Sequence, residues 1–264
     1  MTARISFVSA GSGGLGKSSG ARAIAQSLAL TGLRVVLVDA NPGQQSQRAF
    51  LAAPDDAGLE RARLEADVTD ALVMPGDIDA DFALLPGPLE PDAPRLLDGY
   101  GEALVRLRDV ADIIVVDVDR VDGRVWDDPR SIGGGLMRPF LETGGARLVF
   151  RIGQTGSQLD DGLAALDAIG LPDITLAIAQ VPAGLRPRRD ADWRAMLDGL
   201  ASFGGSDTWD AASVNMIDAG RAGWPRGEEP DWLRRACVWC GGDERDYRRG
   251  DGGWLSGLLH RHRR

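Results

Sequence analysis

Short apolar runs recur along the chain, separated by longer segments in which apolar residues have helical spacing. The first run, residues 4–9, is followed by a glycine-rich turn and then by apolar residues three and four positions apart up to Ala29. A second run at 35–38 is apolar throughout, as expected for a strand covered on both faces. Further runs lie at 82–85, 113–116, 148–150 and 174–178. This alternation predicts a three-layer α/β fold, with a mostly parallel twisted sheet and helices on both faces.

The rest of the pattern is weaker. Ser157 is placed to cap a helix running to Ile169, and residues 193–200 carry the apolar face of another helix. Little periodicity is present in three stretches, which are predicted to be loops with short elements: 40–66, 122–135 and 204–230. The polar, arginine-rich end of the chain predicts a flexible tail over 241–264, after a single domain over 1–240.

Composition indicates a globular protein of ordinary kind. Hydrophobic residues make up 44% and charged residues 26% of the 264 residues, and the net charge of -9 argues against coating nucleic acid by charge alone. Met1 leads directly into the apolar run, so no secretory leader is indicated. No apolar run approaches the roughly 20 residues that span a bilayer. Together with only two cysteines, these features predict a cytoplasmic protein.

The thirty basic residues include a single lysine, Lys17. Surface cations tolerate exchange between lysine and arginine, but a site that needs a compact ammonium group does not. The retention of Lys17 in a chain otherwise free of lysine therefore indicates a chemical requirement at this position.

Residues 11–18 satisfy the phosphate-loop pattern G-x-x-x-x-G-K-[ST] between a predicted strand and a predicted helix. Its glycines let backbone N–H groups converge on phosphate oxygens, and the following helix directs its positive end at them. Lys17 is expected to reach the β- and γ-phosphates and the Ser18 hydroxyl to join the Mg²⁺ shell. A glycine-rich loop without a ligand is the alternative. The predicted nucleotide-binding residues here are Gly11, Ser12, Gly13, Gly14, Leu15, Gly16, Lys17, Ser18 and Ser19.

Over roughly residues 4–225 the chain resembles the ParA/MinD class of P-loop ATPases. The loop of that family reads K-G-G-x-G-K-[ST], where this chain has S-G-G-L-G-K-S at 12–18; the other similar segments are 35–46, 111–119 and, more weakly, 153–166 and 174–182. The resemblance implies ATP and Mg²⁺ as ligands, with Asp39 and Asp117 acting on the metal through water. It also places Gln180 near the adenine. Asp119 and Asp122 are alternatives to Asp117.

Two departures from the family pattern bear on catalysis. Ser12 stands where the family has the signature lysine that reaches across an ATP-bound dimer, and Asn41 replaces the second aspartate of its D-x-D segment. An amide orients water but cannot accept a proton as a carboxylate does. With Lys17 and Asn41 as the catalytic candidates, we expect a weak ATPase that needs stimulation by a partner. An arginine supplied in trans, such as Arg48, is one candidate for the missing cation.

Basic side chains offer a surface for nucleic acid. Arg186, Arg188 and Arg189 cluster around a proline and are candidates for non-specific DNA contact. The alternative is a solvated face paired with nearby acidic residues.

Two features near the end of the chain remain open. Cys237 and Cys240 form a single C-x-x-C, which either holds two reduced thiols or bridges a metal or iron–sulfur cluster across a dimer. Residues 252–264 place Trp and Leu at helical spacing beside His and Arg, as in the membrane-binding tail of MinD-type proteins. The alternative for this tail is packing on its own domain or on a partner.

The resemblance implies an ATP-dependent homodimer that positions or partitions a cargo on DNA or membrane with the help of an activating partner protein. The cargo would be a plasmid, a chromosome, or a secretion or conjugation apparatus. The substitutions at Ser12 and Asn41 favour a second hypothesis, a nucleotide-binding scaffold with negligible hydrolysis. The third hypothesis is a metal or iron–sulfur carrier that uses Cys237 and Cys240.

Overall fold

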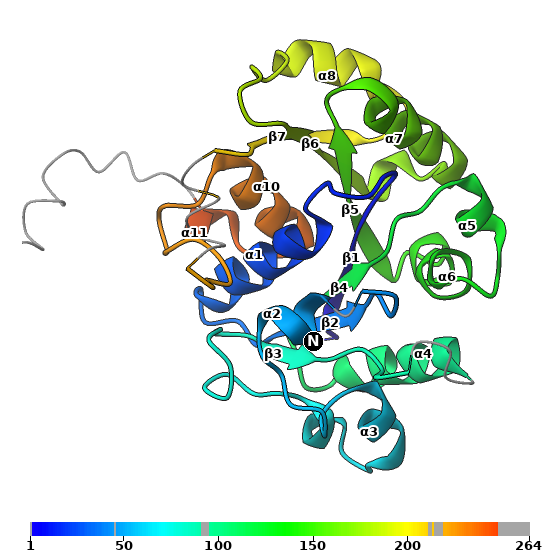
Figure 1. Cartoon of the computed structure of the whole chain (residues 1–264), viewed down its shortest axis with the longest axis vertical. Helices are drawn as coiled ribbons and strands as arrows, with labels where there is room; N and C mark the ends of the chain where they lie inside the picture. The colour runs from blue at the N-terminus through cyan, green and yellow to red at the C-terminus, as the bar shows by residue number, and fades with distance from the viewer. Residues whose placement is uncertain (1, 45, 91–94, 211–212, 214–218, 248–264) are drawn as a thin grey trace, which may run out of the picture.

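Seven parallel strands form one sheet at the centre of the computed structural model, in the order β3-β2-β4-β1-β5-β6-β7 (Figure 1). The structure describes residues 2–44, 46–90, 95–210, 213 and 219–247. The strands are β1 Arg4–Ala10, β2 Val35–Ala40, β3 Ala83–Leu85, β4 Ile113–Val118, β5 Ala146–Gly153, β6 Thr175–Val181 and β7 Ser202–Thr208. The predicted parallel α/β sheet is confirmed.

Helices cover both faces of this sheet (Figure 1). One face packs against α1 Lys17–Ala29 and α10 Asp231–Cys240, and α11 Glu244–Tyr247 follows α10 on the same side. The opposite face packs against α3 Leu59–Leu64, α4 Leu96–Leu107, α5 Gly123–Asp127, η2 Ile132–Met137, α6 Arg138–Glu142, α7 Gly156–Ile169 and α8 Asp190–Met196. The short elements α2 Ser46–Phe50, η1 Val68–Ala71 and η3 Pro172–Ile174 complete the described helices.

The apolar runs form strands because their side chains are needed on both faces. In β1, Phe7 belongs to the core beneath α4 and α7, while the next residue, Val8, belongs to the core beneath α1 and α10. All six residues of β2 and all six of β4 are buried. This double burial explains why these strands read as continuous apolar runs and not as alternating patterns.

β7 was not predicted, because its sequence is polar and falls in a stretch that was expected to be a loop. It lies at the edge of the sheet, where a strand forms backbone hydrogen bonds with one neighbouring strand, here β6. Gly204 permits the pairing, since a Cβ at this position would overlap the Ile178 side chain. β7 therefore forms because its backbone can approach β6 closely, and not because its side chains are apolar.

The start of α7 also differs from expectation. The helix begins at Gly156 with Thr155 as its N-cap residue, and no side chain caps its first turn. Ser157 lies inside that turn, so its predicted role as a cap is wrong. The helix is instead stabilised by the packing of Ala165, Leu166 and Ile169 in the core.

Residues 241–247, which the sequence placed in the tail, include α11. Tyr247 is buried, and its hydroxyl donates a hydrogen bond to the Ser27 carbonyl of α1 at 3.1 Å. This aromatic contact packs the first part of the expected tail on the domain. Residues 248–264, including the amphipathic segment 252–264, lie outside the described residues.

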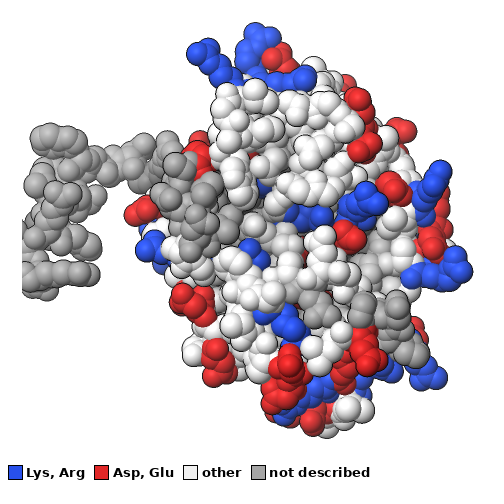
Figure 2. All heavy atoms as spheres, in the orientation of Figure 1, with Lys and Arg blue, Asp and Glu red and all other residues white. Residues whose placement is uncertain are grey.

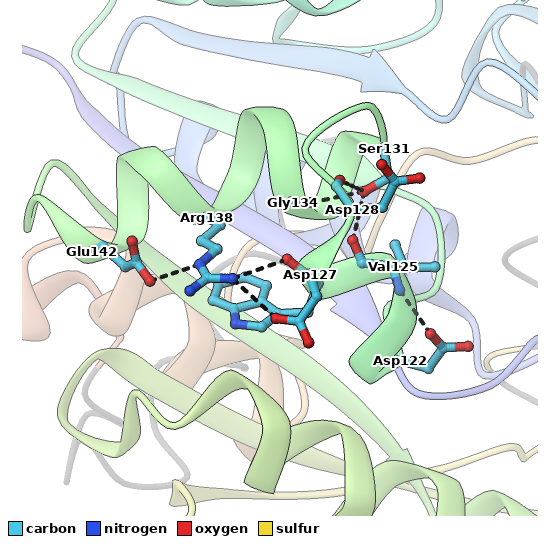
Figure 3. Close-up of polar contacts among 9 residues, drawn as sticks. Asp122, Val125, Asp127, Asp128, Ser131, Gly134, Arg138 and Glu142 are labelled. Atoms are coloured by element: carbon cyan, nitrogen blue, oxygen red, sulfur yellow. Dashed lines mark hydrogen bonds and ion pairs between the residues drawn. The ribbon is translucent and has the colours of Figure 1, made fainter.

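The segment after β4 folds as three short helical elements tied by polar contacts (Figure 3). Asp122 caps α5 by accepting a hydrogen bond from the Val125 N–H at 2.9 Å, and Ser131 caps the π-helix η2 through the Gly134 N–H at 2.8 Å. Arg138 then bridges Asp127 and Glu142. The sequence shows little apolar periodicity in this segment, and the side-chain caps help to stabilise its short helices.

Candidate functional site

The phosphate loop connects β1 to α1 at the carboxyl end of the sheet. Gly14 and Gly16 adopt φ values of 73° and 68°, the left-handed conformation that glycine adopts without strain. Gly11 faces α7 so closely that a Cβ would lie 2.8 Å from the Gly162 Cα. The loop therefore needs glycine at these positions for its turn and for its contact with α7.

Lys17 and Ser18 begin α1, as the motif requires. The Lys17 side chain is 7% exposed, and its Nζ lies 3.8 Å from Asp119 Oδ1, a carboxylate that is half exposed. Ser18 lies beside Asp117, the penultimate residue of the buried strand β4. An ammonium group and a hydroxyl group thus stand at the N-terminus of a helix, the arrangement that binds phosphate groups and their metal.

Asp39 and Asp117 lie next to each other on neighbouring strands. They are register partners of β2 and β4, and both are fully buried. Burial is the largest cause that raises the pKa of Asp117 to about 7, and the nearby Asp39 charge adds to it; Ser18 and Lys17 act in the opposite direction. Burial also raises the pKa of Asp39, although backbone hydrogen bonds oppose the shift.

These residues fit a magnesium ion. Among the described residues, Asp117 Oδ1 is buried and has no hydrogen-bond partner, so one carboxylate oxygen next to Ser18 is left for another ligand. Mg²⁺ prefers oxygen ligands and is commonly held by one or two carboxylates together with phosphates and water. In the described part of the chain, no group of three or more His, Cys, Asp or Glu side chains is arranged so that it could hold a metal ion by itself.

The two alternatives to Asp117 have other positions. Asp119 is exposed and lies beside Lys17, and Asp122 caps α5. Neither is paired with Asp39, which favours Asp117 as the metal carboxylate.

Ser12 and Asn41, the two departures from the family pattern, are both buried. The Ser12 hydroxyl donates to Asp161 Oδ2 of α7 at 2.9 Å. The Asn41 N–H donates to Asp39 Oδ1 at 3.2 Å, while its own side-chain Oδ1 has no hydrogen-bond partner among the described residues. Ser12 is therefore used inside its own chain, and the Asn41 amide retains an acceptor.

Gln180 lies near the end of β6, and its side chain is 7% exposed. Its Oε1 accepts a hydrogen bond from Arg151 Nη2 at 3.1 Å. If a Cβ were added to Gly16, it would lie 3.3 Å from the same oxygen, so the glutamine packs directly against the phosphate loop.

Comparison with known proteins identifies the family. Residues 6–206 match the model of the CobQ/CobB/MinD/ParA nucleotide-binding domain. The chain belongs to this family. A search of curated proteins gave no match.

Solved structures share the fold over most of the chain. The MinC:MinD cell division complex of Aquifex aeolicus is 18% identical, with 89% of this chain and 96% of that chain covered and a TM-score of 0.61. The ParA family ATPase of Chlorobium tepidum is 14% identical, covering 90% and 98%, with a TM-score of 0.64. The Mg-ADP complex of the septum site-determining protein MinD from Pyrococcus horikoshii is 20% identical, covering 91% and 95%, with a TM-score of 0.62. At these identities the likeness shows the fold.

Gln47 and Arg22 are further residues of this MinD/ParA-type site that sequence reasoning missed. Gln47 Nε2 donates to Asp117 Oδ2 at 2.6 Å and to the Ser18 carbonyl at 3.0 Å. Arg22 Nη1 donates to Gln47 Oε1 at 2.9 Å, and its guanidinium carbon lies 3.6 Å from the centre of the Phe50 ring. Burial lowers the pKa of Arg22 to about 10. In the sequence, the one indication of these contacts was Arg22, a basic residue on the buried face of α1.

Arg48 was expected as a candidate to reach another molecule, and the structure contradicts this. Its side chain is 8% exposed, and its guanidinium donates to three backbone carbonyls, of Pro54, Ala57 and Gly87. Arg48 therefore stabilises the loop after α2 and is not free to act as an arginine finger.

The three arginines proposed for DNA contact lie between β6 and α8. Figure 2 shows basic and acidic side chains together over α8. Arg189 pairs with Asp192 at 2.7 Å, and Arg188 lies 3.6 Å from the Met196 sulfur. All three are exposed, so the structure makes them accessible, with one of them neutralised by a carboxylate.

Cys237 and Cys240 belong to α10, form no disulfide and are buried in the core between this helix and the sheet. Burial raises the pKa of Cys240 to about 11 and raises that of Cys237 further. A thiol that is enclosed and protonated is a poor ligand for a metal shared between two chains. The structure therefore favours reduced thiols.

No helix in the described ranges has the length and apolar content needed to cross a bilayer.

Proposed function

We propose that this chain is a MinD/ParA-like ATP-binding protein whose ATP-dependent homodimer positions or partitions a cargo on DNA or membrane. One observation carries the proposal: Lys17 and Ser18 begin a helix directly beside the buried pair Asp39 and Asp117. This combination supports binding of a nucleoside triphosphate with its metal, which the family uses as a dimerisation switch.

Each residue of the site has a defined task in this proposal. Backbone N–H groups of residues 11–16 and the Lys17 ammonium would bind the phosphates, and the Ser18 hydroxyl would hold Mg²⁺ with Asp39 and Asp117 acting through water. Bound Mg²⁺ would neutralise charge on the β- and γ-phosphates. Gln180 and Ser19 would lie along the nucleoside side of the phosphate loop.

Hydrolysis is expected to be slow. Asn41 can orient an attacking water but cannot take its proton, and the Ser12 hydroxyl is already bonded to Asp161. Lys17 would be the one cation that the loop itself supplies to the transferred phosphate. We infer that an activating partner protein supplies the rest, because Arg48 is committed to its own loop.

Two working surfaces are compatible with this function. Arg186, Arg188 and Arg189 would contact DNA phosphates without sequence preference, and a dimer would double these contacts. The segment 252–264 would bind anionic lipid weakly in one copy and more strongly in a dimer.

A turnover assay tests the proposal. Purified protein is incubated with ATP and Mg²⁺ alone, with DNA, and with anionic lipid vesicles, and phosphate release is followed. Slow basal release that rises with one of the two surfaces supports the positioning function. Tight ATP binding without release under every condition supports the scaffold alternative, which the substitutions at Ser12 and Asn41 favour. Failure to bind ATP removes both.

A further inference from the structure

Three polar side chains, those of Arg151, Gln180 and Asp207, form a layer directly beneath the phosphate loop. Gly153, Gln180 and Asp207 are register partners across β5, β6 and β7, so their side-chain positions share one face of the sheet. Arg151 lies two residues before Gly153 and therefore faces the same way, towards α1 and α10. Arg151 is 1% exposed, in a strand whose other central residues are apolar. A charged residue at such a position requires specific partners.

The partners of Arg151 satisfy its charge and fix its orientation. Its Nη2 forms an ion pair with Asp207 and donates to Gln180 Oε1 at 3.1 Å. The guanidinium carbon lies 4.9 Å from the centre of the Trp232 ring of α10. Because the cation is paired, hydrogen-bonded and stacked, the side chain has one defined position.

Another nitrogen of Arg151 reaches the phosphate loop itself, while Nη1 is buried and has no hydrogen-bond partner among the described residues. Nε donates to the Leu15 carbonyl at 3.1 Å, and a Cβ added to Gly16 would lie 3.5 Å from Nη2. The carbonyl of Leu15 and the N–H of Gly16 belong to one planar trans peptide and point in opposite directions. Holding the carbonyl down towards Arg151 therefore turns the Gly16 N–H up, towards the side on which phosphate would bind.

We propose that Arg151 is a positioning residue for the phosphate loop, which holds the Leu15–Gly16 peptide in its phosphate-binding orientation before the ligand arrives. This inference rests on the proposed function, because it assumes that the loop binds nucleotide. An ordered loop loses less conformational freedom on binding, so the contact increases affinity for the phosphates. It acts on the triphosphate and not on the base.

The experiment compares affinities of the full chain and its variants for ATP, ADP and inorganic tripolyphosphate by titration calorimetry. Arg151→Met removes the charge and the hydrogen bonds, and Arg151→Lys keeps the charge but loses the planar guanidinium that reaches both Leu15 and Asp207. We expect both to weaken all three ligands by about tenfold or more, the equivalent of one lost charge-assisted hydrogen bond.

A matched control separates positioning from general stability. Like Arg151, Arg106 joins separate segments of the chain through its guanidinium: it donates to the backbone carbonyls of Ala62, Glu65 and Ala66, but it lies on α4 away from the loop. Arg106→Met is expected to lower the unfolding temperature while leaving the three affinities unchanged. If Arg151→Met does not fold, Arg151→Lys carries the comparison.

The possible outcomes are distinct. If the folded Arg151 variants bind the three ligands as tightly as the wild type does, the inference is overturned. The proposed function is still supported in that case, because the wild type binds the ligands. A loss confined to ATP and ADP, with tripolyphosphate unaffected, also overturns it, because the arginine would then act through Gln180 on the nucleoside. If the wild-type protein binds none of the three ligands, the proposed function itself fails.

Discussion

Lys17 is the one lysine of the chain, and among the described residues its side chain has a single carboxylate within 4 Å, the half-exposed Asp119. Its removal should therefore cost little folding stability but much of the attraction for phosphate. We predict that Lys17→Ala lowers ATP affinity by about a hundredfold, because two or more charge-assisted hydrogen bonds are lost. Titration with ATP measures this, with the unfolding temperature as the control. Unchanged affinity would overturn the assignment of the site.

Asp117 predicts a pH dependence of the ligand-free protein. Its pKa of about 7 lies above the ordinary value of 3.8, so the folded state holds the proton more tightly than the unfolded chain does. Below about pH 4 both states are protonated and the shift contributes nothing. As the pH rises to 7 the unfolded state releases its proton first, so the free energy of unfolding decreases. This decrease reaches roughly 4 kcal/mol at most.

Asp117→Asn removes this loss because the amide does not titrate. In the absence of nucleotide and metal, the variant should become more stable than the wild type as the pH rises from 5 to 8. Urea denaturation at both ends of this range measures the difference. A difference that is the same at both pH values would show that burial of Asp117 does not raise its pKa.

At the scale of elements, the π-helix η2 depends on glycine for close packing. A Cβ on Gly135 would overlap the Pro129 carbonyl oxygen, and the adjacent Gly134 N–H donates to the Ser131 hydroxyl that caps η2. We predict that Gly135→Ala lowers the free energy of unfolding by about 1–3 kcal/mol. Gly101→Ala in α4, where nothing lies within 4 Å of the added Cβ, should instead raise it by about 0.5–1 kcal/mol. Denaturation of both variants in urea tests the contrast, and equal effects would contradict it.

Elements with continuous apolar runs could be predicted from sequence, and so could the motif residues at their ends. The strands ending at Ala40 and Val118 were visible, and each carries its proposed metal carboxylate as the penultimate residue. β7 was not visible because its polar sequence depends on pairing with β6. Gln47 and Arg151 were missed for a related reason: their partners lie 29 to 136 residues away along the chain, and only the fold brings them together.

At the scale of the whole molecule, the sheet brings the proposed ligand-binding groups together at one end. β1, β2, β4, β5 and β6 all run in the same direction, so the phosphate loop, both carboxylates and the supporting arginine meet at their carboxyl ends. Ligands of open α/β sheets bind at this end. The proposed dimer would form over this site, since the γ-phosphate is what distinguishes ATP from ADP there.

The measurement that tests this account most directly is the mass of the protein in solution with Mg-ATP and with Mg-ADP, by light scattering after size exclusion. The account predicts a monomer of 28.1 kDa with ADP and a particle of twice that mass with ATP. Lys17→Ala should remain monomeric with both nucleotides. The same mass for the wild type with ATP and with ADP, at concentrations where both are bound, would contradict the dimerisation switch.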